Sequence, residues 1–131
     1  MLSKKYGIRA LYLFGSRAAE RANPSSDYDF AVILDAKISP AEYSRYKLNI
    51  ISELLRFIKT EHIDLVVLND DKVPLLLKYN VIKDGKVIFE NNKQQRTAAE
   101  ANILIRWLDW QYFEKMWGDI HIKQAAAGKF I

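Results

Sequence analysis

Short apolar runs alternate with stretches of helical periodicity along this chain. Four runs are rich in the β-branched and aromatic residues that favour strands. They are residues 8–14, 29–34, 63–68 and 87–89. The third run is apolar except for Asp64, which is typical of a strand that is covered on both faces or lies centrally in a sheet. The last run follows the turn pair Asp84-Gly85 and predicts an edge strand.

The segment after the second run predicts a helix with a well-marked start. Ser39 is suited to cap the free backbone N–H groups, and Pro40 suits the first helical position. Glu42 would complete a capping box with Ser39. Apolar residues at helical spacing continue this helix to about Lys59.

Further helices are expected elsewhere along the chain. Residues 16–21 are good helix formers and suit one or two turns, and residues 73–81 are ambiguous, with a short helix as one reading if it begins at Pro74. Residues 94–117 predict a long last helix that ends near Gly118. Strands and helices thus alternate, which predicts an α/β (α+β) fold with helices packed on a small mixed sheet.

The chain has the size and apolar content of a single domain. It has 131 residues, half of them hydrophobic, and no linker that would divide it. We expect one domain over residues 1–131, with a core at about residues 7–90 and a helical segment at about residues 91–120.

Composition excludes several classes of protein. Cysteine is absent, so disulfides and thiolate metal sites are impossible. No signal peptide and no apolar stretch of transmembrane length is present, so we expect no membrane association and a soluble, cytoplasmic protein. The net charge of +4 is mild and spread along the chain. It suits an anionic ligand such as a nucleotide, but it is too weak to predict direct nucleic-acid binding.

Three aspartates lie in or beside the predicted strands. Asp27 and Asp29 are two residues apart, so in extended chain both side chains point to the same face. Two neighbouring carboxylates repel each other unless a cation lies between them, and hard oxygen ligands suit magnesium. If the third strand lies beside the second, Asp64 becomes the third acid of a two-metal cluster.

Gly15-Ser16 lies where the first strand ends and a short helix is expected. Free N–H groups at a helix start favour phosphate, glycine permits close approach of the backbone, and Ser16 adds a hydroxyl donor. Arg17 would add another phosphate contact, and the alternative is an exposed arginine on the helix face. The plainer alternative is that Gly15 only ends a strand and that the aspartates lie in a solvated loop. Asp64 has a similar alternative, in which a backbone donor satisfies it at a strand end.

Other catalytic motifs lack support. No Gly-rich loop followed by Lys-Ser/Thr and no dinucleotide-binding GxGxxG occurs, so kinase, GTPase and dehydrogenase functions are not indicated. The serines do not form a nucleophile elbow. His62 and His121 have no partners at metal or triad spacing, although His62 is close in sequence to Asp64.

Residues 11–34, LYLFGSRAAERANPSSDYDFAVIL, resemble the signature of the DNA polymerase beta-like nucleotidyltransferase superfamily. The short chain resembles, more narrowly, the minimal nucleotidyltransferase (MNT) antitoxins of HEPN/MNT toxin–antitoxin pairs. The resemblance implies that Gly15 and Ser16 form the nucleotide-phosphate turn. It makes Asp27 and Asp29 metal ligands for Mg²⁺ and Asp64 the third carboxylate, near the attacking hydroxyl. It also implies transfer of AMP from ATP to a tyrosine of a partner HEPN ribonuclease toxin, which silences the toxin.

Two features depart from the pattern of that family. Tyr28 replaces the aliphatic residue expected between the aspartates, which is tolerable on a face turned away from the metals. Only six or seven residues precede the first strand, where relatives usually have a longer helix.

The last helix is apolar nearly all the way round, whereas a surface helix of a lone small domain shows one apolar stripe. Its apolar residues are Ile103, Leu104, Ile105, Trp107, Leu108, Trp110, Tyr112, Phe113, Met116 and Trp117. We therefore expect this helix to contribute to a protein–protein interface. The alternative is that it is sandwiched within the core.

These observations favour an Mg²⁺-dependent enzyme that moves AMP from ATP to a protein hydroxyl. The first alternative is a binding-only antitoxin that neutralises its toxin by occlusion. Clustered carboxylates argue against it, because a pure binder does not need them. The second alternative is a nucleotidyltransferase for a small molecule, which the shortness of the chain disfavours.

Overall fold

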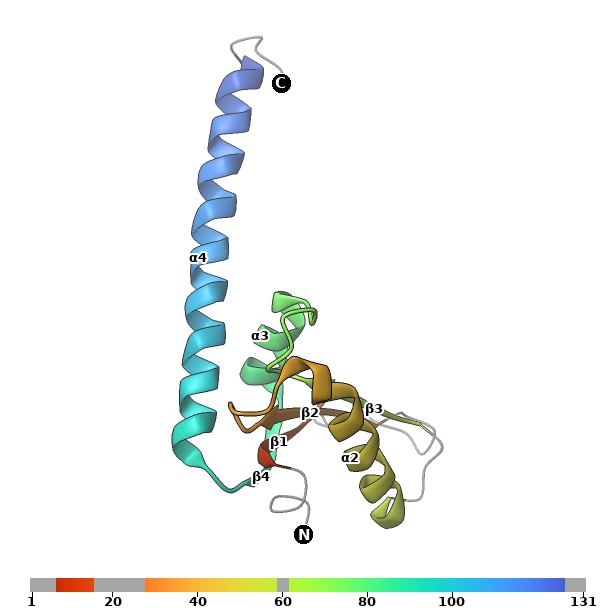
Figure 1. Cartoon of the computed structure of the whole chain (residues 1–131). Helices are drawn as coiled ribbons and strands as arrows, with labels where there is room; N and C mark the ends of the chain where they lie inside the picture. The colour runs from red at the N-terminus through yellow and green to blue at the C-terminus, as the bar shows by residue number, and fades with distance from the viewer. Residues whose placement is uncertain (1–6, 16–27, 59–61, 127–131) are drawn as a thin grey trace.

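A four-stranded mixed sheet forms the centre of the molecule (Figure 1). The structure is a computed structural model that describes residues 7–15, 28–58 and 62–126. The strands are β1 (Ile8–Phe14), β2 (Tyr28–Leu34), β3 (Ile63–Val67) and β4 (Lys86–Glu90), in the order β3-β2-β1-β4. β1 pairs antiparallel with β2 and β4, whereas β2 and β3 are parallel. All four predicted strands are therefore confirmed, with β4 at an edge.

Helices flank this sheet and complete the predicted α/β arrangement. They are a 3₁₀ turn η1 (Pro40–Glu42), α2 (Tyr43–Phe57), α3 (Leu75–Asp84) and α4 (Lys93–Ala126). The ambiguous segment after β3 is helical and begins directly after Pro74. The helix expected at residues 16–21 lies outside the described residues. No helix in the described parts of the chain has the length and apolar character needed to cross a membrane.

Two details of the predicted helices are wrong. The Ser39 side chain makes no capping hydrogen bond, because the Glu42 N–H donates to the Ser39 carbonyl at 3.0 Å and closes a 3₁₀ turn. The Glu42 carboxylate instead pairs with Arg45 at 3.3 Å. The last helix does not end near Gly118 but continues to Ala126. One glycine in a helix interior costs only about 1 kcal/mol, which a long helix tolerates.

Each face of the sheet has its own apolar cluster. Phe30 and Val32 of β2 pack with Ile50 and Leu54 of α2 on one face. On the other face, Tyr12 and Ile33 pack with Val81 of α3 and Ile103 of α4, as part of a second cluster. Because residues alternate between faces along a strand, the central strands β1 and β2 are buried on both sides. This explains their continuous apolar runs.

A polar network holds the first part of α4 to the sheet. Tyr12 of β1 is almost fully buried, and its hydroxyl donates to the Glu100 carboxylate at 2.6 Å. Arg96 bonds to the same carboxylate at 2.8 Å and to Glu90 of β4 at 2.6 Å. Burial and the neighbouring Glu100 raise the pKa of Tyr12. Beyond this anchored part, α4 extends well past the rest of the molecule (Figure 1).

Candidate functional site

Two of the predicted aspartates are direct neighbours at one edge of the sheet. In the parallel pair of β2 and β3, Asp29 lies in register with Asp64. Residues in register on adjacent strands have side chains on the same face, with backbones about 4.8 Å apart. The structure thus confirms that the third strand lies beside the second, which was the condition for Asp64 to join Asp29.

The two carboxylates lie at the rim of the sheet rather than in its core. Asp29 lies on the α3 and α4 face of β2, because Ala31 and Ile33 at the alternate positions belong to the apolar cluster there. Asp29 is half-buried, whereas Asp64 is exposed. Asp64 therefore keeps its hydration and does not bear the cost of a buried charge. Like charges this close favour a bound cation.

Gly15 brings the end of β1 against the Asp29 carboxylate. Phe14 is in register with Asp29, so the next residue turns directly past the aspartate. Gly15 has a φ of +76°, in the left-handed region that side chains disfavour. A Cβ at this position would overlap the Asp29 carboxylate oxygen. Only glycine therefore allows this turn and this aspartate to lie together.

The other predicted site residues lie outside the described part of the chain. These are Ser16, Arg17 and Asp27, and their placement remains a prediction. Within the described ranges, no three acidic or histidine side chains gather closely enough to hold a metal ion. Asp29 and Asp64 supply two of the three carboxylates expected there.

Tyr28 and His62 lie close to the aspartates in the sequence. Tyr28 packs with the α2-side cluster and stacks on Phe30 with ring centroids 6.0 Å apart. It therefore faces away from the carboxylates, as expected. His62 lies next to β3 with an exposed side chain, and its carbonyl accepts a hydrogen bond from the Tyr28 N–H at 3.2 Å. This bond extends the β2–β3 pairing to the rim of the site.

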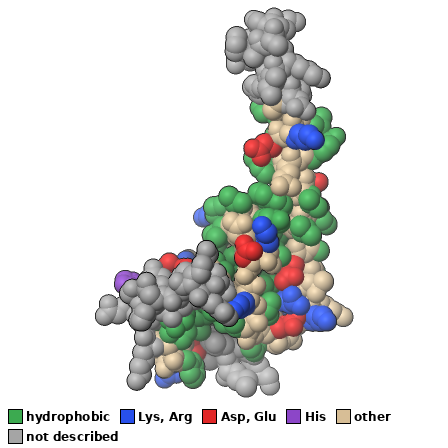
Figure 2. Space-filling view, turned by 180° about the vertical axis from the view of Figure 1, so that it is seen from behind, with side chains coloured by type: hydrophobic (Ala, Val, Ile, Leu, Met, Phe, Trp, Pro, Cys, Tyr) green, Lys and Arg blue, Asp and Glu red, His purple; other side chains and the backbone are tan. Residues whose placement is uncertain are grey.

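An exposed aromatic surface lies on α4 beyond its anchored part. The rings of Trp110, Phe113 and Trp117 stack in sequence, with centroids 6.0 and 6.2 Å apart. About half of each of these side chains is exposed. Of the ten apolar residues expected on this helix, only Ile103 is buried. The alternative that the core sandwiches the whole helix is therefore wrong, and hydrophobic side chains are visible on α4 beyond the body (Figure 2).

The fold and the paired carboxylates define a nucleotidyltransferase class of domain, and comparison with known proteins agrees. Residues 1–94 match the family model described as polymerase beta, nucleotidyltransferase. The chain belongs to this polymerase beta nucleotidyltransferase family.

Several known proteins resemble this chain over most of its length. The protein adenylyltransferase MntA of Aphanizomenon flos-aquae is 30% identical over 125 residues, which cover 88% of this chain and 79% of that protein. A crystal structure of a toxin–antitoxin with AMP-PNP matches with a TM-score of 0.65 and 20% identity, covering 92% of this chain and 93% of the other. A tri-AMPylated Shewanella oneidensis HEPN toxin in complex with MNT antitoxin matches with a TM-score of 0.60 and 18% identity, covering 92% and 90%. These two structural matches support the same fold.

The geometry at Gly15 predicts opposite effects for two glycine-to-alanine substitutions. Gly15→Ala forces a side chain into a left-handed turn and against Asp29, so it should lower the free energy of unfolding by about 1–2 kcal/mol or more. Gly118→Ala is the matched control, because a Cβ there meets no atom within 4 Å. It should raise the free energy of unfolding by about 0.5–1 kcal/mol. Urea denaturation measures both values, and an unchanged stability of Gly15→Ala would contradict the described turn.

Proposed function

We propose that this protein is an Mg²⁺-dependent adenylyltransferase that moves AMP from ATP to a tyrosine hydroxyl of a HEPN-family toxin and so acts as its antitoxin. The observation that carries the proposal is the register of Asp29 with Asp64, with the Gly15 turn directly against Asp29. The names of the similar proteins support the acceptor, since one is a protein adenylyltransferase and another is bound to an AMPylated HEPN toxin.

The described residues fit magnesium and a nucleotide. Asp29 and Asp64 offer adjacent carboxylate oxygens at an open rim, which are the ligands that magnesium prefers. Asp27, two residues before Asp29, would be the third ligand. When bound, Mg²⁺ supplies stabilisation of the negative charge that develops on the attacking and leaving oxygens.

The phosphates of ATP would lie at the turn that follows β1. Gly15 has no side chain to keep a phosphate away from the backbone, and it is exposed. Ser16 would donate its hydroxyl to a phosphate oxygen, and Arg17 would add a cationic contact. The turn therefore orients the triphosphate relative to the carboxylates, which fixes the direction of attack on the α-phosphorus.

The reaction would be an in-line displacement. The acceptor tyrosine oxygen forms a bond to the α-phosphorus of ATP, and the bond from that phosphorus to the bridging oxygen of the β-phosphate breaks. Pyrophosphate leaves with the electron pair of the broken bond. Asp64 is exposed at the rim of the site, where it would accept the hydroxyl proton or pass it to water.

The aromatic surface of α4 would hold the toxin. Large aromatic side chains that are half-exposed and stacked on one another are typical anchors of protein interfaces. The anchored part of α4 is fixed to the sheet that carries the carboxylates, through Tyr12 and Glu100. A toxin bound along this helix would therefore be held at a defined position relative to the carboxylate rim.

The proposed transfer predicts loss of activity when a carboxylate is neutralised. We expect Asp27→Asn, Asp29→Asn and Asp64→Asn each to reduce labelling of the toxin by ATP labelled at the α-phosphate. The loss should be roughly a hundredfold or more, since metal stabilisation of the transition state is worth several kcal/mol. Chelation of Mg²⁺ should abolish labelling. Asp84→Asn, at the exposed end of α3, is the matched control and should leave the rate unchanged.

The alternatives give different results in the same assay. Wild-type protein that neutralises toxicity with no label on the toxin would support a binding-only antitoxin. Label recovered on a small molecule rather than on the toxin would support a small-molecule nucleotidyltransferase. Labelling that all three carboxylate variants retain would show that the metal assignment is wrong.

The aromatic surface predicts a binding defect that is separable from catalysis. Phe113→Ala removes the ring that stacks between Trp110 and Trp117, and it should weaken toxin binding at least tenfold, or about 1.4 kcal/mol. Phe57→Ala is the matched control, because Phe57 is also exposed but lies at the end of α2. Titration calorimetry with the toxin measures both affinities. Equal affinities of the two variants would show that this part of α4 is not the docking surface.

A further inference from the structure

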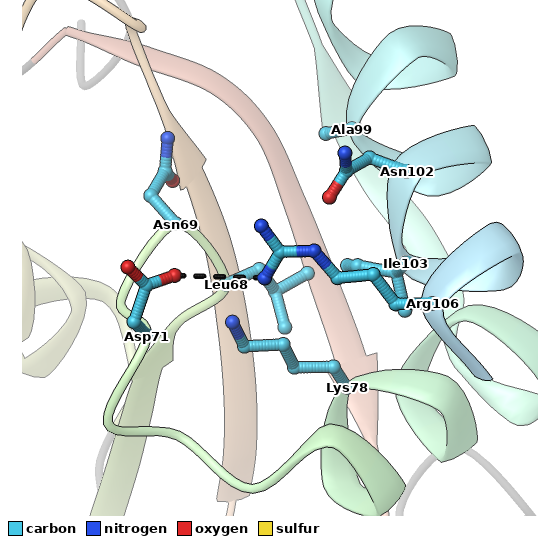
Figure 3. Close-up of a pocket in the computed structure, with 8 residues that line it drawn as sticks. All are labelled: Leu68, Asn69, Asp71, Lys78, Ala99, Asn102, Ile103 and Arg106. Atoms are coloured by element: carbon cyan, nitrogen blue, oxygen red, sulfur yellow. Dashed lines mark ion pairs between the residues drawn. The ribbon is translucent and has the colours of Figure 1, made fainter. Parts of the chain in front are cut away.

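A pocket lined by both charged and apolar side chains lies between α3, α4 and the end of β3 (Figure 3). Its volume is about 170 Å³. Leu68 lines it and is four residues beyond Asp64, which corresponds to about 13 Å along an extended chain. The pocket therefore lies towards the opposite end of β3 from the paired carboxylates.

Lys78 of α3 is a buried residue whose side chain lines this pocket. Lys78 is 5% exposed, and no other charged residue in the described ranges is buried to this extent. The side chain points into the cavity (Figure 3). Within the described parts of the chain, the ammonium has neither a hydrogen bond nor an ion pair at bonding distance. A buried charge with no such partner is costly, and it is the kind of group that a ligand satisfies.

The charges around Lys78 favour an anion. Arg106 of α4 and Lys78 both extend towards Asp71, and the Arg106 guanidinium is 3.7 Å from the Asp71 carboxylate (Figure 3). The lining therefore carries two cations and one carboxylate. Burial lowers the pKa of Lys78, an effect that Arg106 adds to and that Asp71 and Asp70 oppose. A bound anion beside the ammonium would oppose this lowering of the pKa.

The lining also offers one neutral donor and limits the size of a ligand. The Asn102 amide on α4 borders the cavity, whereas the Asn69 amide is already bonded to the Leu34 backbone at 2.8 and 3.0 Å. A cavity of about 150 Å³ holds a molecule as large as benzene. This pocket therefore has room for an anionic head group with a short chain.

We propose that this pocket binds a small molecule that carries a phosphate or carboxylate group, with Lys78 and Arg106 as its cationic donors. The site is independent of the proposed nucleotidyl transfer, because it uses none of the predicted catalytic residues. α3 and α4 both contribute to it, so an occupied pocket would hold the two helices together.

Titration with simple anions tests this site on the full chain. Inorganic phosphate and acetate are added separately, with sodium chloride at equal ionic strength as the reference. We expect at least one of them to raise the melting temperature saturably and to shift the side-chain NMR resonances of Lys78. The better of the two probes identifies the ligand as a phosphate or a carboxylate. Absence of saturable binding for both anions would overturn the proposal, and a partner group would then be the better candidate for Lys78.

Matched variants show whether binding occurs at this pocket. Lys78→Met keeps the apolar stem but removes the charge, so it should fold and bind the better anion at least tenfold more weakly. Lys83→Met, on the exposed side of the same helix, should bind as the wild type does. Arg106→Gln alters a half-exposed side chain and provides the same test if Lys78→Met does not fold. Wild-type affinity in the folded pocket variants would overturn the assignment.

Discussion

The site depends on the register of β2 between its two neighbours. Antiparallel pairing with β1 places Phe14 opposite Asp29, and parallel pairing with β3 places Asp64 on the other side of Asp29. A slip of one residue in either pair would turn the side chains to the other face of the sheet and separate the carboxylates. The register is held by the apolar clusters on both faces, since every slip would expose core residues such as Phe30 and Ile33. Core packing and the candidate chemistry thus rest on the same constraint.

α4 divides into an anchored part and an extended part with different roles. Near its start, Arg96 and Glu100 bond to the sheet, and Ile103 packs in the core. From Trp110 to Trp117, the large apolar side chains of α4 are exposed and belong to neither apolar cluster of the sheet. The anchored part gives the extended part a fixed direction, which lowers the entropic cost of binding a partner. The helix therefore fixes the position of the aromatic surface relative to the carboxylates on the sheet.

The strands were predictable because their signals are local. Apolar runs marked all four strands, and the Asp27–Asp29 spacing with Gly15 marked the candidate site. The position of Asp64 beside Asp29 depends on strand order, which local patterns leave open, so the sequence predicted it only conditionally. The prediction that the Ser39 side chain caps the helix was wrong, because the Ser39 backbone carbonyl accepts the hydrogen bond from the Glu42 N–H instead. The pocket at Lys78 was not predicted, because Lys78 becomes buried only when α4 packs against α3. The one local signal for it was a lysine that directly follows three leucines.

The central claim is that Gly15, Asp29 and Asp64 surround one metal–nucleotide site. Paramagnetic broadening of backbone amide NMR signals by Mn²⁺ in place of Mg²⁺, with the ATP analogue AMP-PNP present, tests it directly. The account predicts that the amides of these three residues broaden first, that Asn69 and Gly118 stay sharp, and that Asp29→Asn removes the effect. Broadening centred on another part of the chain, or none that depends on the nucleotide, would contradict the account.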